Sequence, residues 1–472
     1  MKQRKFNLLY VLLMAVFVLS SCSKSSQKNA KFIPDNAVVV SIDVKQILEK
    51  GKIADNAEAK KKLLENIEQG AKNQETKDLF KKIIDDPAKA GVDLREPLFF
   101  FTTADNKDMG IVGTLLDKGD FTEVLNAVAK EAGMEAAKEK DGFQYLESDG
   151  TIIVFDDATF FASEGKKLED VIAKFKNDDT KGTMAESDDF AKLTESKGFI
   201  KALIPMAIAE GQLGDAKKML PEGADLKDLS VLLDLSSSKG EAKLTFNMIA
   251  KSDAWKKHIK ENSEICGNIS GDYLKYLPKG ALMIYTNFNG KKMFELFEKK
   301  GLFKQAGMES QIDIAKKILE SIDGDFALGV GEVKGSMPQI AAYLKTKDQA
   351  ITDMVKEQGL KPGDQGVDFG YKDGATYVAV GTDAFKEASA KFDKSAISGR
   401  RFYMFCDVEL IAGLAGMING QAAEGAKSAS EVIKTAEIYD TSDTEGELIV
   451  KFKDAEKDPI EFFAEMALKS IM

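Results

Sequence analysis

The chain has 472 residues, of which 44% are hydrophobic and 30% are charged, and its formal net charge is -11 at pH 7. This composition supplies enough apolar surface for a sizeable core and excludes a disordered stalk. The acidic balance argues against a nucleic-acid partner, because displacing counterions from phosphates needs clustered Lys and Arg. The lysine-rich stretches at 60–62 and 291–300 are flanked by or interleaved with Glu and apolar residues, a pattern typical of solvated helix faces.

The N-terminal segment has the organisation of a bacterial signal peptide. Basic residues precede an apolar run over residues 8–19, which is shorter than the about 20 apolar residues that a membrane-spanning helix needs. The run ends in Leu19-Ser20-Ser21-Cys22, which resembles the lipobox of bacterial lipoproteins. The resemblance implies that residues 1–21 are a signal peptide that is removed. It also implies that the Cys22 thiol carries a diacylglycerol and that the new amino group carries an acyl chain such as palmitate. The alternative is an ordinary secreted protein with a chance cysteine.

Residues 22–30 are polar and predict a flexible tether between the lipid and the folded body. Each buried methylene of an acyl chain contributes about 0.8 kcal/mol, so several chains hold a protein on its membrane. Ser23 is not the aspartate typical of inner-membrane retention signals, and no acidic run of the kind found in surface-export signals follows Cys22. These features favour an anchor in the outer membrane, with the body facing the periplasm.

Strand-like and helix-like segments alternate through the first half of the body without a low-complexity linker. One helix places Phe121, Val124, Leu125 and Val128 on a single face. The predicted elements are, in chain order, a strand at 37–42, a largely helical region at 45–84, a hairpin with strands at 98–102 and 111–116, the helix that contains Phe121, and hairpins with turns at 148–150 and 238–240.

The same order of elements recurs in the second half. The segment 276–284 echoes 32–40, each with a proline before a strand, and a final helix begins at Asp458. The other predicted elements are strands at 326–333 and 340–344, a helix at 349–358, and hairpins with turns at 372–374 and 444–446.

Self-similarity in a fixed order predicts a duplication, with one unit at 31–270 and a second at 271–472. The alternative is a coincidence, since this order of elements is common. Because hairpins dominate, we expect an α+β fold of two similar tandem units. Each unit is predicted to have a mainly antiparallel sheet covered on one face by amphipathic helices.

If Cys22 is lipidated, Cys266 and Cys406 are the remaining cysteines. An oxidising periplasm permits a disulfide between them, but no spacing rule brings their Cα atoms within bridging range, so both the paired and the free state stay open. Cys406 lies in the apolar run 402–408, which suits a small buried hydrophobic residue.

The chain contains one histidine, His258. The usual serine or cysteine triad needs a histidine base, which in this chain could only be His258, and the count disfavours most zinc sites. His258 lies in a charged helical segment and is predicted to be exposed, whereas nearby Trp255 is predicted to be a core anchor rather than a sugar-stacking platform. Neither residue is assigned to a site.

Two glycine-containing patterns resemble ligand loops without meeting their requirements. In Gly329-Val330-Gly331 the flanks are strand-like and the third glycine, Gly335, comes one residue late for a dinucleotide loop. The segment 105–110 has a lysine at the third place of a calcium loop, where an oxygen ligand belongs. The sequence therefore predicts a hairpin and a turn, and we assign no catalytic, cofactor-binding or metal-binding residue.

Two further patterns have both a structural and a functional interpretation. Acid pairs at 156–157 and 178–179 lie in turn-like segments, although two carboxylates at a working separation are what glycoside hydrolysis requires. The small-residue stretch at 411–417 is predicted to be a closely packed buried helix, with a lipid-contacting helix as the alternative.

The lipobox, the strand after Ile33-Pro34, the lysine- and glutamate-rich helical region and the second Leu277-Pro278 copy together resemble a family of Bacteroidetes envelope lipoproteins, of the domain of unknown function 4836 type. The resemblance covers nearly the whole mature chain. Its motifs are structural, so it implies an envelope protein and supplies no catalytic residues.

We therefore expect a non-enzymatic, lipid-anchored envelope protein that serves as a binding or structural module. Its expected partners are the membrane, through the lipid, and an envelope protein, a polymer or another ligand; no cofactor is expected. The alternative is a carboxylate-based periplasmic hydrolase that acts on glycans. A hydrolase needs a pocket with convergent acids whose pKa values are perturbed, whereas a binding module does not.

Overall fold

The computed structural model describes residues 26–470, apart from 53–55, 149, 212, 215–219, 306, 308, 335–336, 388–393 and 419. The predicted signal peptide and Cys22 lie outside these residues. Within the described part, no helix combines the length and the apolar character that a membrane span requires.

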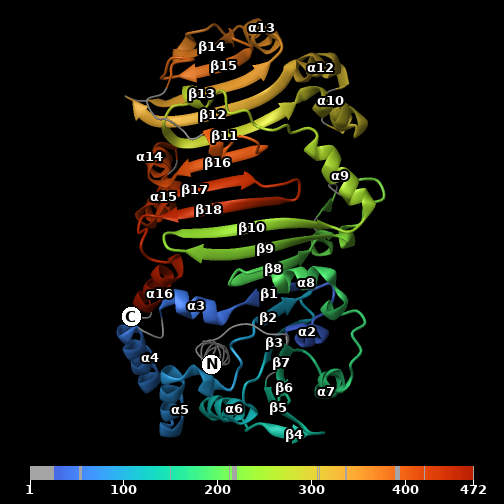
Figure 1. Cartoon of the computed structure of the whole chain (residues 1–472), viewed down its shortest axis with the longest axis vertical. Coiled ribbons are helices and arrows are strands. Elements are labelled where there is room, and N and C mark those ends of the chain that lie inside the picture. Colours follow the sequence, from blue (N-terminus) through green and yellow to red (C-terminus); the bar gives the residue numbers. More distant parts are fainter. Residues whose placement is uncertain are drawn as a thin grey trace. The chain divides into compact units, whose positions relative to one another are not determined.

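The chain divides into two compact units. Unit 1 contains the described residues up to 214, residues 225–239 and the end of the chain from 456; unit 2 contains the described residues of 215–224 and residues 240–455. Both units combine helices with antiparallel strands, which confirms the α+β fold class (Figure 1). This division places a boundary at 239/240, whereas the sequence predicts a repeat boundary at 270/271.

Unit 1 is built on an antiparallel sheet with the strand order β4-β5-β6-β7-β3-β2-β1-β8-β9. The strands are β1 (Val38–Ile42), β2 (Leu98–Thr102), β3 (Met109–Thr114), β4 (Lys138–Lys140), β5 (Phe143–Ser148), β6 (Thr151–Phe155), β7 (Thr159–Glu164), β8 (Ile200–Pro205) and β9 (Leu229–Ser238). The helices are α2 (Ser26–Asn29), α3 (Val44–Gly51), α4 (Ala57–Gly70), α5 (Gln74–Asp85), α6 (Lys118–Ala132), α7 (Leu168–Lys176), α8 (Asp188–Glu195) and α16 (Pro459–Ser470), with 3-10 turns that include η1 (Ala30–Phe32).

Helical segments contact both faces of the unit 1 sheet. Neighbouring Phe160 and Phe161 on β7 point to opposite faces, because side chains alternate along a strand. The ring of Phe160 lies 5.2 Å from Phe121 on α6. The ring of Phe161 lies 5.3 Å from Phe32 on η1, which in turn lies 4.6 Å from Phe175 on α7. Helical segments therefore pack on both faces of the sheet, whereas the sequence predicts helices on one face only.

The strands of unit 2 are also antiparallel, with the order β14-β15-β13-β12-β11-β16-β17-β18-β10. The strands are β10 (Glu241–Ala250), β11 (Gly280–Asn289), β12 (Ile322–Lys334), β13 (Met337–Thr346), β14 (Val367–Lys372), β15 (Ala375–Val380), β16 (Phe402–Asp407), β17 (Ile433–Asp440) and β18 (Glu445–Phe452). The helices are α9 (Asp253–Ser263), α10 (Gly290–Lys299), α11 (Leu302–Gln305), α12 (Ile312–Ser321), α13 (Ala350–Glu357), α14 (Val408–Ile418) and α15 (Gly420–Val432), with 3-10 turns that include η7 (Leu274–Tyr276) and η10 (Lys394–Ala396).

The strands of the two units share a pairing order. In unit 1 the run β6-β7-β3-β2-β1-β8-β9 has the same sequence of connections as β14-β15-β13-β12-β11-β16-β17 in unit 2. This agreement is what a duplication predicts. In this alignment Gly374, in the turn between β14 and β15, corresponds to the turn at 156–158. It does not correspond to Gly150, which lies in the turn between β5 and β6. The order of turns along the sequence predicts that Gly374 corresponds to Gly150, and this prediction is wrong.

The folded body begins earlier than the predicted tether of residues 22–30 allows. Asn29 and Ala30 are buried, with 1% and 0% of their surface exposed. The Asn29 side chain donates a hydrogen bond of 3.1 Å to the Thr114 hydroxyl on β3. Because a buried amide needs such partners, the polar composition of this segment does not indicate a flexible chain beyond residue 26.

Candidate ligand-binding site

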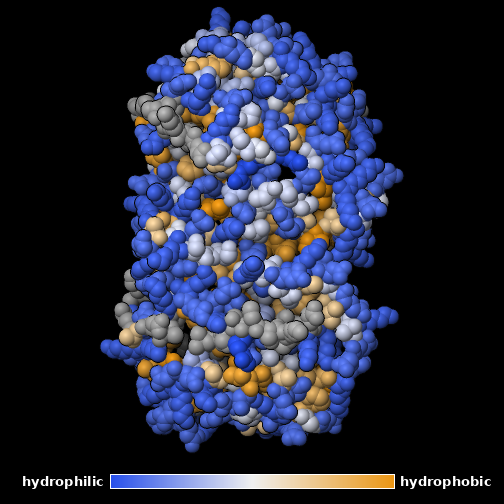
Figure 2. All heavy atoms as spheres, in the orientation of Figure 1, coloured by the Kyte–Doolittle hydropathy of each residue, from blue (hydrophilic) through white to orange (hydrophobic). Residues whose placement is uncertain are grey.

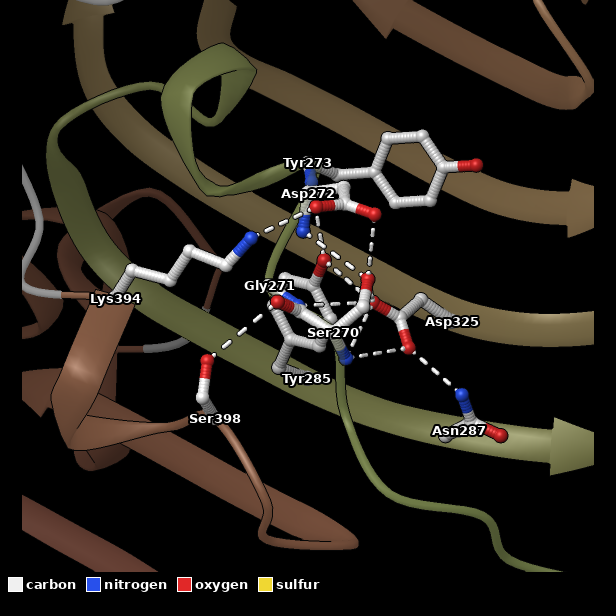
Figure 3. Close-up of polar contacts among 9 residues, drawn as sticks. All are labelled: Ser270, Gly271, Asp272, Tyr273, Tyr285, Asn287, Asp325, Lys394 and Ser398. Carbon is white, nitrogen blue, oxygen red and sulfur yellow. Dashed lines mark hydrogen bonds and ion pairs between the residues drawn. The ribbon is translucent and has the colours of Figure 1, made fainter.

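A buried carboxylate organises one loop of unit 2 (Figure 3). Asp325 on β12 is 1% exposed. It accepts hydrogen bonds from the backbone N–H groups of Ser270 and Gly271 and from the Ser270 hydroxyl, the last at 2.6 Å. The Tyr285 hydroxyl and the Asn287 amide on β11 donate to it as well, at 3.0 and 2.7 Å. These bonds fix the loop that enters η7.

This loop forms one side of a pocket of about 890 Å³ in unit 2. The volume lies within the range of small-molecule sites, about 300–1,000 Å³. The other walls are the ends of β12 and β13, the β14–β15 turn and the segment around Phe385 and η10.

Aromatic rings line the pocket next to η7. Tyr276 and Phe385 are half-buried and lie 5.3 Å apart, between ring centroids, and Phe385 lies 5.0 Å from the buried Tyr343. Phe385 has a φ of +57°, a conformation that bulky residues rarely adopt. Its backbone N–H donates a 3.0 Å hydrogen bond to the hydroxyl of Tyr343, which is 0% exposed. The surrounding structure thus holds this ring in place against a backbone cost.

The pocket contains equal numbers of cationic and anionic side chains. Its cations are Lys275, Lys345, Lys347 and Lys394, and its anions are Asp272, Asp323, Asp373 and Glu387. The Lys394 ammonium donates a 2.8 Å hydrogen bond to Asp272, and this bond, together with one from Ser270, lowers the pKa of the Asp272 carboxyl. Equal numbers of cations and anions favour a ligand that is neutral or zwitterionic over a polyanion.

The tyrosine hydroxyls near Asp325 suit hydrogen bonding rather than proton transfer. Burial, and then the charge of Asp325, raise the pKa of the Tyr273 hydroxyl to about 12 and raise that of Tyr285 further. Both phenols therefore stay neutral near pH 7. A hydrolase acid needs a raised carboxyl pKa, and Asp272 is shifted in the opposite direction. Asp272 is therefore not suited to the role of that acid.

The corresponding face of the unit 1 sheet is filled in a different way. Ser41 and Phe99 pair on that face, as Tyr285 and Ala327 do in unit 2. The ring of Phe99 lies 5.3 Å from Phe190 on α8, and apolar packing closes the space. The tyrosines are therefore particular to unit 2, whereas a buried acid is not, since Asp189 on α8 is buried and accepts a 2.8 Å hydrogen bond from the Ser230 hydroxyl on β9.

The comparisons with known proteins agree with a family of unknown function. The model of the family described as "Domain of unknown function (DUF4836)" matches residues 30–429. The chain belongs to this family. No curated protein matches it.

Crystal structures of TP0453 are weakly similar to this chain. Crystal form I of TP0453 is 13% identical, with a TM-score of 0.27, and the match covers 51% of this chain and 86% of that one. Crystal form III is 15% identical, with a TM-score of 0.26, and the match covers 53% of this chain and 85% of the other. Likenesses at this level carry no argument about function.

The structure places the motif candidates of this DUF4836 chain away from the pocket. His258 on α9 is partly exposed and its ring nitrogen lies 3.0 Å from the Asn262 amide; burial, and then Lys300, lower its pKa. Trp255 is 7% exposed, as expected of a core residue. Cys266 and Cys406 are both free.

The loop-like motifs have the structural roles that the sequence predicts. The segment 105–110 turns between β2 and β3, and Asp105 is bonded to Thr103 and Lys107. Gly329 and Gly331 lie in β12, where a Cβ atom at either position would come within 2.9 Å of Pro278. These glycines therefore admit a close approach of the loop to the strand. Among the described residues no cluster of His, Cys, Asp or Glu suits a metal ion.

The acid pairs lie in turns, as predicted, whereas the small-residue helix differs from its prediction. Asp156 accepts hydrogen bonds from the backbone of its own turn, and Asp179 does the same for Lys181. Residues 411–415 lie in α14 and are half-buried or exposed, so the closely packed, buried environment expected for 411–417 is not found there.

The pocket residues were missed because no local motif contains them. Lys394 and Asp272 are separated by 122 positions in the chain, and Asp325 and Ser270 by 55. The available signal was compositional, since eight tyrosines lie after residue 270. That bias indicates a cluster of polar aromatic side chains in the second half, but it does not say which elements hold it.

Proposed function

We propose that this protein is a non-enzymatic, lipid-anchored binding protein of the bacterial cell envelope, and that the pocket next to η7 holds its ligand. The lipobox at Cys22 supports the anchor through diacylglycerol and a palmitate-type chain. The residues after Cys22 favour the outer membrane, facing the periplasm.

The observation that carries the binding role is the pair of half-buried rings, Tyr276 and Phe385, held beside a balanced set of charges. An aromatic ring offers a flat apolar surface at a low cost in side-chain entropy, and adjacent charged groups orient a polar ligand. We infer a neutral or zwitterionic ligand with an apolar face, such as a segment of an envelope polymer.

The test is a binding screen by calorimetry and by thermal unfolding on the full mature chain. The panel contains neutral oligosaccharides and short peptides with equal numbers of Lys and Glu, with heparin and polylysine as charged controls. A ligand at one hundred times its Kd should stabilise the fold by about 2.7 kcal/mol.

The variant Tyr276→Ala should abolish this stabilisation, while Tyr145→Ala, at a half-buried tyrosine of unit 1, should leave it unchanged. Binding of polyanions alone would contradict the proposal. So would a Tyr276→Ala protein that keeps full affinity, or a panel without any binder.

A further inference from the structure

A second pocket, of about 780 Å³, lies within unit 2 on the opposite face of its sheet. Ile284 and Leu344 line this pocket, whereas their neighbours Tyr285 and Tyr343 point to the first face, because side chains alternate along a strand. Helix α9 forms a wall, and the β17–β18 turn contributes polar residues. On the face drawn in Figure 2, apolar residues gather beside α9 over the ends of β10 and β18.

The lining of this pocket is apolar and incompletely covered. None of its apolar side chains is buried, and Met248 and Phe402 are each 37% exposed. The apolar members are Met248, Ile259, Ile284, Phe288, Met293, Ile322, Phe326, Leu344 and Phe402. A folded core packs such residues closely, so an unfilled space of this size indicates an apolar ligand.

The charged groups of the pocket restrict the charge that its ligand can have. The backbone N–H groups of Arg401 and Phe402 donate to Asp440, the latter at 2.7 Å. The Arg401 guanidinium is already paired with Asp443. One cation and two anions leave a net charge of -1, which repels a carboxylate or a phosphate and offers acceptors to hydroxyl donors.

We propose that this pocket binds one acyl chain bearing an uncharged, hydroxyl-rich head group. The chain lies against the apolar lining, and the head donates hydrogen bonds to Asp440, Ser442 and Asp443. This site is independent of the pocket next to η7, since it uses the other face of the sheet.

The probe is Nile red, an uncharged fluorophore, bound to the mature chain from residue 22 with Cys22→Ser, so that no detergent competes. Monomyristoylglycerol, below its aggregation concentration, should displace Nile red at about tenfold lower concentration than myristate does. Equal or stronger displacement by myristate would overturn the uncharged head group. Failure of both lipids to displace the probe would overturn the site.

Variants locate the binding. Phe402→Asp should weaken Nile red binding about tenfold, with Met248→Asp as a second variant if the first does not fold. Val378→Asp is the matched control, because Val378 is 39% exposed and pairs with Ala342 on the same sheet face without lining the pocket. An equal loss in the control would overturn the assignment.

Cys266 gives a second readout. It lines the pocket, and burial raises the pKa of its thiol, so alkylation should be slow. In a Cys406→Ser background, monomyristoylglycerol should slow the alkylation of Cys266 by N-ethylmaleimide further. An unchanged rate at saturating lipid would contradict the proposal.

Discussion

At the scale of single residues, Asp325 holds the binding loop of unit 2. Its carboxylate accepts hydrogen bonds from three backbone or side-chain donors of Ser270 and Gly271 and from Tyr285 and Asn287. We predict that Asp325→Asn lowers the free energy of unfolding by about 3 kcal/mol, because the new amide nitrogen faces donors and leaves them unsatisfied. Urea unfolding monitored by tyrosine fluorescence measures the change.

The control for this prediction is Asp323→Asn, two positions earlier on β12 and exposed. It should change the free energy of unfolding by less than about 0.5 kcal/mol. Equal effects of the two substitutions would mean that the hydrogen bonds to Asp325 do not hold the loop.

At the scale of elements, Glu131 joins α6 to the turn between α4 and α5. Its carboxylate accepts hydrogen bonds from the backbone N–H groups of Lys72 and Asn73, at 3.0 and 2.7 Å, and from the Asn73 side chain. Burial alone would raise the pKa of Glu131, but these hydrogen bonds outweigh it and lower the pKa. Asn73 makes no side-chain capping bond to α5, so the hydrogen bonds to Glu131 contribute to positioning the start of the helix, beside the apolar packing of α5 on α6.

A lowered carboxyl pKa stabilises the fold above the unfolded-state pKa, about 4.3, and this stability is lost as the pH falls through the folded-state value. We predict that Glu131→Gln costs about 1–3 kcal/mol of unfolding free energy at pH 7 and that the difference from the wild type shrinks below about pH 4. Unfolding curves across the pH range measure it. Glu135→Gln, at an exposed partner of Lys138, is the control, and a pH-independent cost would refute the linkage.

At the scale of the whole molecule, the folded body starts close to Cys22, the proposed lipidation site. Only residues 23–25 separate Cys22 from α2, whose last residue, Asn29, is buried and hydrogen-bonded to β3. We predict that wild-type protein incorporates labelled palmitate and partitions into detergent, whereas Cys22→Ser yields unlabelled precursor or soluble protein. Absence of label from the wild type would show that the cysteine is not an anchor, and unchanged labelling of Cys22→Ser would show that the lipid is attached elsewhere.

Much of the element pattern was predictable from local sequence. The strand after Pro34, the buried face of α6 from Phe121 to Val128 and the helix that begins after Asp458 are found where the periodicity and the capping residues place them. The helical region at 45–84 is divided into three helices, α3, α4 and α5. Its division was harder to predict because helix-forming residues continue past the breaks.

Family and fold class follow from the sequence by itself, because each depends on composition, short-range periodicity or a motif of adjacent residues. Only the tertiary structure decided where a ligand can bind. Both pockets combine segments that sheet pairing brings together across long stretches of chain, as when Lys394 meets Asp272. Strand register also decided which neighbour, Ile284 or Tyr285, faces which pocket, and one position of slip would exchange them.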